Sequence, residues 1–191
     1  MDKPQIYLDK ISSEDKFGFL SNVDNWSSHR PLLYLALQLT NESKLPVLEM
    51  GCGEGSSHYL QNYCNETDRK LVSYDSNKEW AEKYNSVFVD DWWNRPDIFE
   101  TNYSVAFIDH APGEHRWIAI KKLVDKCDII VFHDAELFGA GDYKYENIRH
   151  LFKYELDYNL IGGGAGCSAV SNKINLDVFK VCSLTNFKFD A

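Results

Sequence analysis

Two pairs of ionisable residues stand where proton or metal chemistry can be done. Asp109-His110 and His133-Asp134 each follow a short apolar run of the chain. An imidazole beside a carboxylate can act as a general base at neutral pH, and two carboxylates together can hold a divalent cation. These four residues are our candidates for catalysis, and we expect Glu136 to lie close to them.

A glycine-rich turn points to a second kind of chemistry, the binding of a cofactor. Residues 49–55 read Glu-Met-Gly-Cys-Gly-Glu-Gly, after the apolar run 46–48 and before Ser56. This order predicts a strand, a tight turn and a helix. Glycine at alternate positions removes three side chains, so the backbone can approach a ligand closely. In doubly wound α/β folds such a turn binds a nucleotide-like cofactor.

Acids further along the chain extend this predicted cofactor site. Asp75 ends a predicted strand, where an acid can accept hydrogen bonds from both ribose hydroxyls or can instead cap the following helix. Asp90 and Asp91 end the next predicted strand, and either could accept the adenine amino group. Trp92 beside them could stack on the adenine ring or pack in the core. We take Asp75, Asp91 and Trp92 as cofactor-binding candidates.

The elements that must position these residues alternate between strand and helix. We expect strands at 46–50, 71–75, 86–89, 104–109 and 128–133, and helices at 30–41, 56–64, 77–84, 114–126 and 143–150. The continuous apolar runs 105–108 and 129–132 are typical of a parallel sheet that is covered on both faces. Parallel strands bring their carboxyl ends to one edge, so the candidate residues should meet there.

The C-terminal part departs from this alternation. Residues 152–158 and 167–171 flank the glycine-rich stretch 162–166, which predicts an antiparallel hairpin. The fold class expected is therefore α/β, a doubly wound, mostly parallel seven-stranded sheet with a C-terminal antiparallel hairpin.

Length and charge set further bounds. A chain of 191 residues suits one domain, with an N-terminal helical cap over 1–44 and a core over 45–191. The net charge of −9 and the absence of a basic run argue against nucleic acid as a partner. No apolar run approaches the ~20 residues of a membrane span. Five cysteines without a Cys-x-x-Cys pair indicate free thiols and a cytoplasmic location. The chain could be one domain of a larger enzyme.

The order of motifs over about residues 45–171 resembles the class I S-adenosylmethionine-dependent methyltransferases, with Glu-x-Gly-x-Gly-x-Gly at 49–55 similar to their motif I. The resemblance implies S-adenosylmethionine as the cofactor and a Rossmann-like core. The residues that it places around the cofactor are Glu49, Gly51, Gly53, Ser56, Asp75, Asp91, Trp92 and Asp109. Ser28, His29 and Arg30 could fold over the methionine end of the same molecule.

Phe-Ile-Asp-His at 107–110, followed by an aspartate at the next strand end, resembles the catechol-type and sugar O-methyltransferases. That resemblance implies a divalent metal such as Mg²⁺ on Asp109 and Asp134. The family's third ligand would fall at Ala135 and its base lysine at Pro112, so neither role is carried over. Glu136 or water could replace the missing ligand, and His110 or His133 could be the base.

The stretch Asp-His-x-Pro-Gly-Glu-x-Arg at 109–116 is similar to bacterial and viral sugar-modifying enzymes, including chlorovirus-like glycan methyltransferase domains. It implies a sugar or glycan acceptor. Aromatic residues that could stack on sugar rings are Trp92, Trp93, Trp117, Tyr143 and Tyr145.

Two other functions remain open. An NAD-dependent oxidoreductase is disfavoured because Ser56 stands where the dinucleotide fingerprint has glycine or alanine, and because the chain ends in a hairpin. A non-catalytic binding module of the same fold is disfavoured because Glu49, Gly51, Asp75 and Asp109 are intact.

Overall fold

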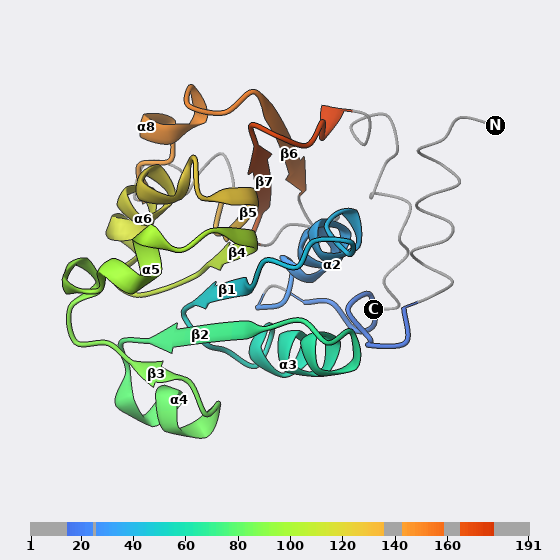
Figure 1. Cartoon of the computed structure of the whole chain (residues 1–191), viewed down its shortest axis with the longest axis vertical. Helices are drawn as coiled ribbons and strands as arrows, with labels where there is room; N and C mark the ends of the chain where they lie inside the picture. The colour runs from blue at the N-terminus through green and yellow to red at the C-terminus, as the bar shows by residue number, and fades with distance from the viewer. Residues whose placement is uncertain (1–14, 25, 136–142, 159–164, 178–191) are drawn as a thin grey trace.

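The computed structural model describes residues 15–24, 26–135, 143–158 and 165–177, and it contains a seven-stranded sheet (Figure 1). The strand order is β3-β2-β1-β4-β5-β7-β6. The strands are β1 Val47–Met50, β2 Leu71–Asp75, β3 Val87–Phe88, β4 Tyr103–Ile108, β5 Cys127–His133, β6 Tyr154–Tyr158 and β7 Cys167–Ser171. Strands β1 to β5 are parallel, and β7 runs antiparallel to both β5 and β6. The predicted fold class is confirmed.

The helices follow the predicted alternation, with shifted ends. They are α2 Arg30–Leu39, α3 Ser57–Glu66, α4 Lys78–Lys83, α5 Pro96–Glu100, α6 Arg116–Leu123 and α8 Glu146–Arg149, with 3-10 turns η1 Trp92–Asn94 and η2 Gly113–His115. The helix expected over 114–126 is divided between η2 and α6. Helix α5, which the sequence analysis did not predict, has proline at its first position, where the missing N–H is not needed.

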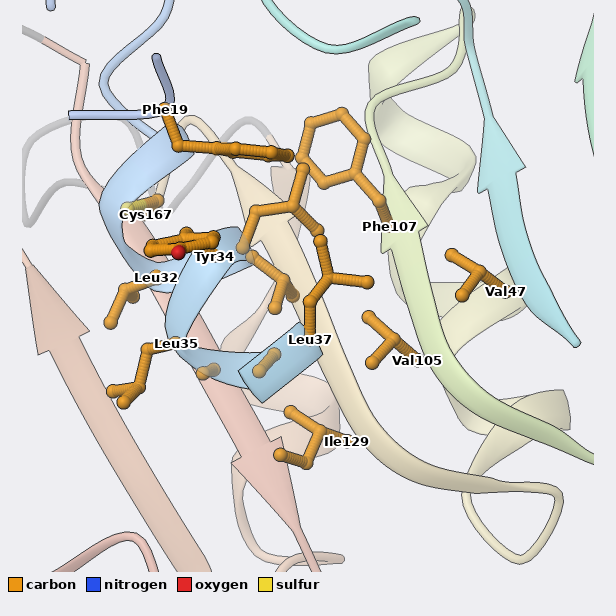
Figure 2. Close-up of a cluster of buried hydrophobic side chains, with 14 of the residues drawn as sticks. Phe19, Leu32, Tyr34, Leu35, Leu37, Val47, Val105, Phe107, Ile129 and Cys167 are labelled. Atoms are coloured by element: carbon orange, nitrogen blue, oxygen red, sulfur yellow. The ribbon is translucent and has the colours of Figure 1, made fainter. Parts of the chain in front are cut away.

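Alternate residues of the central strands enter two cores on opposite faces of the sheet. Val105 and Ile129 belong to the core under α2 and α3, which Figure 2 shows in part. Ala106 and Ile130 belong to the core under α5, α6 and α8. Since both faces are covered, both sets of positions are apolar, which explains the continuous apolar runs.

Helix α2 is buried almost all round, from Arg30 to Leu37. It contacts β4, β5 and β7 (Figure 2). The Arg30 guanidinium reaches 2.7 Å from the carbonyl oxygen of Asn22 and 2.9 Å from that of Ser21. These contacts fix the segment that precedes α2, so Ser28 and His29 are held at the carboxyl edge of the sheet, where β4 and β5 end.

Several predicted features lie outside the described residues: Glu136, the glycines at 162–164, Cys182 and the first fourteen residues of the predicted cap. The cysteines that are described, Cys52, Cys64, Cys127 and Cys167, are free thiols. In the described part of the chain, no helix combines the length and the apolar character needed to cross a membrane.

Candidate active site

The three glycines of the turn differ in what surrounds them. A Cβ on Gly51, whose φ is +92°, would lie 2.5 Å from the carbonyl oxygen of Asp109. A Cβ on Gly55 would lie 2.6 Å from the carbonyl oxygen of Trp26. A Cβ on Gly53 would meet nothing within 4 Å. Gly51 and Gly55 therefore let protein segments pack closely, and Gly53 leaves open space beside the backbone.

The Glu49 side chain stabilises the conformation of the turn. Its carboxylate is buried and accepts hydrogen bonds from the hydroxyls of Ser56, Ser57 and Ser73 at 2.7, 2.8 and 2.7 Å. Burial raises the pKa of Glu49, and the hydroxyl donors oppose that shift. The Ser56 hydroxyl thus donates to Glu49, and this contact stabilises the conformation of the turn.

Asp75 joins the turn to the end of β2. Its Oδ2 accepts from the backbone N–H of Cys52 and its Oδ1 from that of Asn77, both at 2.6 Å. The side chain of Asn77, and not that of Asp75, caps α4 by accepting from the N–H groups of Glu79 and Trp80. Each carboxylate oxygen of Asp75 keeps a second lone pair, so the side chain can accept two further hydrogen bonds.

The residues after β3 divide between surface and core. Asp90 and Asp91 are both exposed, and the Asp91 carboxylate caps η1 by accepting from the Trp93 N–H at 2.9 Å. Trp92 is 4 % exposed and belongs to the core under α6. Its indole N–H donates to the carbonyl oxygen of Ala111 at 2.9 Å. Of the two roles considered for Trp92, this position matches core packing.

His110 packs against Trp92, with ring centroids 4.7 Å apart, and is fully buried. Its Nδ1 lies 3.2 Å from the carbonyl oxygen of Ala111, which can only accept, so Nδ1 carries the proton. Burial lowers the pKa of His110 to about 4, and the ring is neutral at pH 7. His110 is not among the residues that line the cavity described below, whereas His133 is.

Arg116 lies between the two strand-end aspartates. Its Nη2 is 2.8 Å from Asp109 Oδ1 and its Nη1 is 2.8 Å from Asp134 Oδ2. The same guanidinium donates to the carbonyl oxygens of His110 and Asp109 at 2.9 and 3.2 Å and stacks over the Tyr143 ring. Sequence reasoning placed Asp109 and Asp134 together, as the structure does, but it did not foresee that one arginine pairs with both.

His133 stands at the centre of the cluster. Its Nδ1 lies 3.4 Å from Asp109 Oδ2 and 3.7 Å from Asp134 Oδ1, and its Nε2 lies 2.9 Å from the Ser28 hydroxyl. The Tyr145 hydroxyl donates to its backbone carbonyl at 2.9 Å. Burial alone would lower the pKa of His133, but the hydrogen bond and charge of Asp109, with the charge of Asp134, outweigh burial and raise it.

The segment before α2 contributes residues whose role at this cluster the sequence analysis missed. His29 is buried, its ring packs 4.4 Å from Phe107 and 4.8 Å from the His133 ring, and its Nε2 lies 3.2 Å from the carbonyl oxygen of Gly55. Burial, with the nearby charge of His133, lowers the pKa of His29 well below its ordinary value. Ser28 and His29 both contact His133, and His29 also contacts Gly55 of the turn, so their predicted place at the methionine end of the cofactor stays a prediction.

A cavity of about 360 Å³ opens above this cluster. Its lining residues are Trp26, Asp109, Arg116, His133, Asp134 and Ala165. The volume falls in the range of about 300–1,000 Å³ of small-molecule sites. Trp26 is 83 % exposed, whereas Trp92 and Tyr145 are buried in the core. Trp26, which the sequence analysis did not single out, is thus the aromatic side chain in this lining.

No protein-family model matches the sequence, and no curated protein matches it either. Solved structures do match. A human methyltransferase-like protein 13 in complex with SAH aligns over 81 % of this chain and 88 % of its own, at 14 % identity and a TM-score of 0.59. An rRNA methylase from Streptococcus thermophilus aligns over 74 % of this chain and 96 % of its own, at 10 % identity and a TM-score of 0.51. An S-adenosylmethionine-dependent O-methyltransferase from Thermotoga maritima aligns over 76 % of this chain and 66 % of its own, at 11 % identity and a TM-score of 0.54.

The chain has the fold of the class I methyltransferases. At these identities the likeness concerns the fold. Since the same fold carries an rRNA methylase and an O-methyltransferase, it does not by itself select an acceptor.

Proposed function

We propose that this protein is an S-adenosylmethionine-dependent O-methyltransferase that acts on a hydroxyl group of a small sugar or glycan acceptor. One observation carries the proposal. The open face of Gly53 and the cavity lined by Asp109 and His133 lie at the same carboxyl edge of the sheet, where doubly wound folds bind their ligands.

The residues around the turn fit the proposed cofactor. Gly53 leaves room for a ligand against the backbone, and the free lone pairs of Asp75 suit the ribose hydroxyls. We assign the adenine amino group to the exposed Asp91. When bound, S-adenosylmethionine supplies an electrophilic methyl group on a positively charged sulfur. The carboxylates of Glu49, Asp75 and Asp109 provide a negative field suited to that charge.

The cavity residues orient an acceptor and remove its proton. An acceptor hydroxyl has to lose its proton as its oxygen forms the new bond to carbon, and a positioned base contributes roughly 10²–10⁴-fold. His133, whose pKa is raised by Asp109 and Asp134 against the effect of burial, is the base that we assign. Arg116 holds both aspartates in place, and Ser28 fixes the opposite side of the imidazole.

The acceptor assignment is supported by the cavity and by the charge. The exposed indole of Trp26 offers an apolar face at a cavity that is otherwise lined mainly by charged groups, a combination suited to a sugar ring. A net charge of −9 disfavours a polyanionic acceptor. The free thiols are compatible with a cytoplasmic enzyme, which we also propose.

The test is transfer of a radiolabelled methyl group from S-adenosylmethionine to a panel of monosaccharides, oligosaccharides, phenols and RNA fragments. We expect label on a sugar. Asp109→Asn should abolish transfer, whereas the matched control Asp125→Asn, at an exposed position before β5, should retain it. Label on RNA would show that the acceptor is RNA and not a sugar. The absence of label on every acceptor would contradict the proposal.

A further inference from the structure

Three ligand atoms with metal-binding chemistry face one another below the cavity. His29, Asp109 and His133 each offer one such atom, and these atoms all lie within 4.8 Å of one another. Two of the residues are buried and Asp109 is half-buried. The residues come from three separated parts of the chain: the segment before α2, the end of β4 and the end of β5.

On His29 the protonation pattern leaves a lone pair turned toward this point, and on His133 an ion would displace the proton that Nδ1 shares with Asp109. His29 Nε2 lies 3.2 Å from a carbonyl oxygen, which can only accept, so the proton is on Nε2 and Nδ1 carries a lone pair. That Nδ1 is buried and has no hydrogen-bond partner among the described residues. A buried acceptor without a donor is unfavourable, and a bound metal ion would satisfy it.

We infer that His29, Asp109 and His133 form a binding site for a divalent transition-metal ion. Two imidazoles and one carboxylate form a donor set that suits zinc, iron and related ions, whereas Mg²⁺ prefers oxygen ligands. The outer nitrogens are already oriented, since His29 Nε2 faces Gly55 and His133 Nε2 faces Ser28. A hydrogen bond to the second ring nitrogen fixes the orientation of a histidine that binds a metal.

Metal binding requires the three ligand atoms to move closer together. Metal bonds of about 2.0–2.2 Å place neighbouring ligand atoms roughly 3–3.5 Å apart. The separation of 3.4 Å between His133 Nδ1 and Asp109 Oδ2 is already in that range. Arg116 engages the other oxygen, Oδ1, of Asp109 and also Asp134. This donor set therefore differs from the Asp109–Asp134 pair that the sequence resemblance implied, because a guanidinium lies between those two carboxylates.

The experiment is a titration of the full chain with Co²⁺, which reports imidazole ligation through its visible absorption, together with calorimetry with Co²⁺ and Mg²⁺. We expect one Co²⁺ per chain, with Mg²⁺ unable to compete at tenfold excess. His29→Ala should weaken Co²⁺ binding at least tenfold, and His58→Ala, at an exposed position on α3, should leave it unchanged.

Circular dichroism of each variant separates loss of the site from loss of the fold. If His29→Ala does not fold, Asp109→Asn decides, because its side chain is 24 % exposed and the amide keeps the shape. Absence of Co²⁺ binding by the wild type, or equal binding by a folded His29→Ala or Asp109→Asn variant, would overturn the inference. A bound ion would make His133 a ligand and would itself promote deprotonation of the acceptor in place of that base. The two proposals are still tested separately: a chain that binds S-adenosylhomocysteine and no Co²⁺ contradicts only the metal site.

Discussion

Ser28 Oγ lies 2.9 Å from His133 Nε2, although 105 positions of sequence separate the two residues. The contact ties the segment before α2 to the end of β5. It holds one side of an imidazole whose other side faces Asp109 and Asp134. The orientation of the proposed base thus depends on a residue that precedes the first strand of the sheet.

The first prediction concerns this contact. Ser28→Ala should lower the free energy of unfolding by about 1–3 kcal/mol, because a buried nitrogen loses a partner. We expect kcat for methyl transfer to fall roughly tenfold, which corresponds to about 1.4 kcal/mol in the barrier. Urea denaturation and initial rates measure the two effects. Ser43→Ala, in the half-buried loop before β1, is the control, and an equal effect of both variants would contradict the assignment.

The second prediction concerns the arginine between the aspartates. Arg116→Ala leaves two carboxylates facing each other without a counter-charge, and we expect a loss of about 3 kcal/mol in the free energy of unfolding. Adding Asp134→Asn should recover part of that loss, since it removes one of the two charges. The exposed pair of Lys16 and Glu66 gives the comparison: Lys16→Ala should change stability by less than about 1 kcal/mol. Strict additivity in the double variant would show that Arg116 does not couple to Asp134.

The third prediction separates two glycines of the turn. Gly51→Ala should destabilise the fold by at least about 2 kcal/mol, because its φ is positive and the added Cβ would lie 2.5 Å from the Asp109 backbone. Gly53→Ala should fold within about 0.5 kcal/mol of the wild type, since the added methyl meets no protein atom. It should nevertheless weaken S-adenosylhomocysteine binding. A Gly53→Ala variant that binds as the wild type does would place the ligand elsewhere.

The fourth prediction uses the thiol beside the turn. Burial, with the charge of Glu49, raises the pKa of Cys52 to about 12. At pH 8 only about one in ten thousand Cys52 side chains is then the reactive thiolate. Alkylation of Cys52 in the folded protein should rise about tenfold per pH unit from pH 7 to 10 without a plateau.

Mass spectrometry of the Cys52 peptide measures this rate. In urea the rate should level off near pH 9, the range of an ordinary thiol. Glu49→Gln should accelerate the reaction in the folded state, because it removes the second cause of the shift. A plateau near pH 9 in the folded wild type is the result that this account does not allow.

The sequence predicted the sheet because the apolar runs of β4 and β5 are continuous and are flanked by turn residues. It also placed Asp109 and Asp134 at one edge, since parallel strands end together. Strand β2, at 71–75, and strand β7, at 167–171, have the predicted ends.

The cluster around His133 could not be predicted in the same way. His29 reaches it only because the buried helix α2 crosses β4, β5 and β7, and no local pattern encodes that packing. Arg116 ends the 109–116 stretch noted in the sequence, but its double ion pair depends on the turn after β5, where Asp134 has a φ of +56°. Trp26 precedes α2 and reaches the cavity through the same packing.

The central claim is that the turn at 51–55 binds a methyl donor, and calorimetric titration with S-adenosylhomocysteine and, separately, with NAD tests it most directly. We predict one S-adenosylhomocysteine per chain, binding weakened at least tenfold in Asp75→Ala, and no heat from NAD. Binding of NAD in preference to S-adenosylhomocysteine, or S-adenosylhomocysteine binding that Asp75→Ala leaves unchanged, would contradict the account.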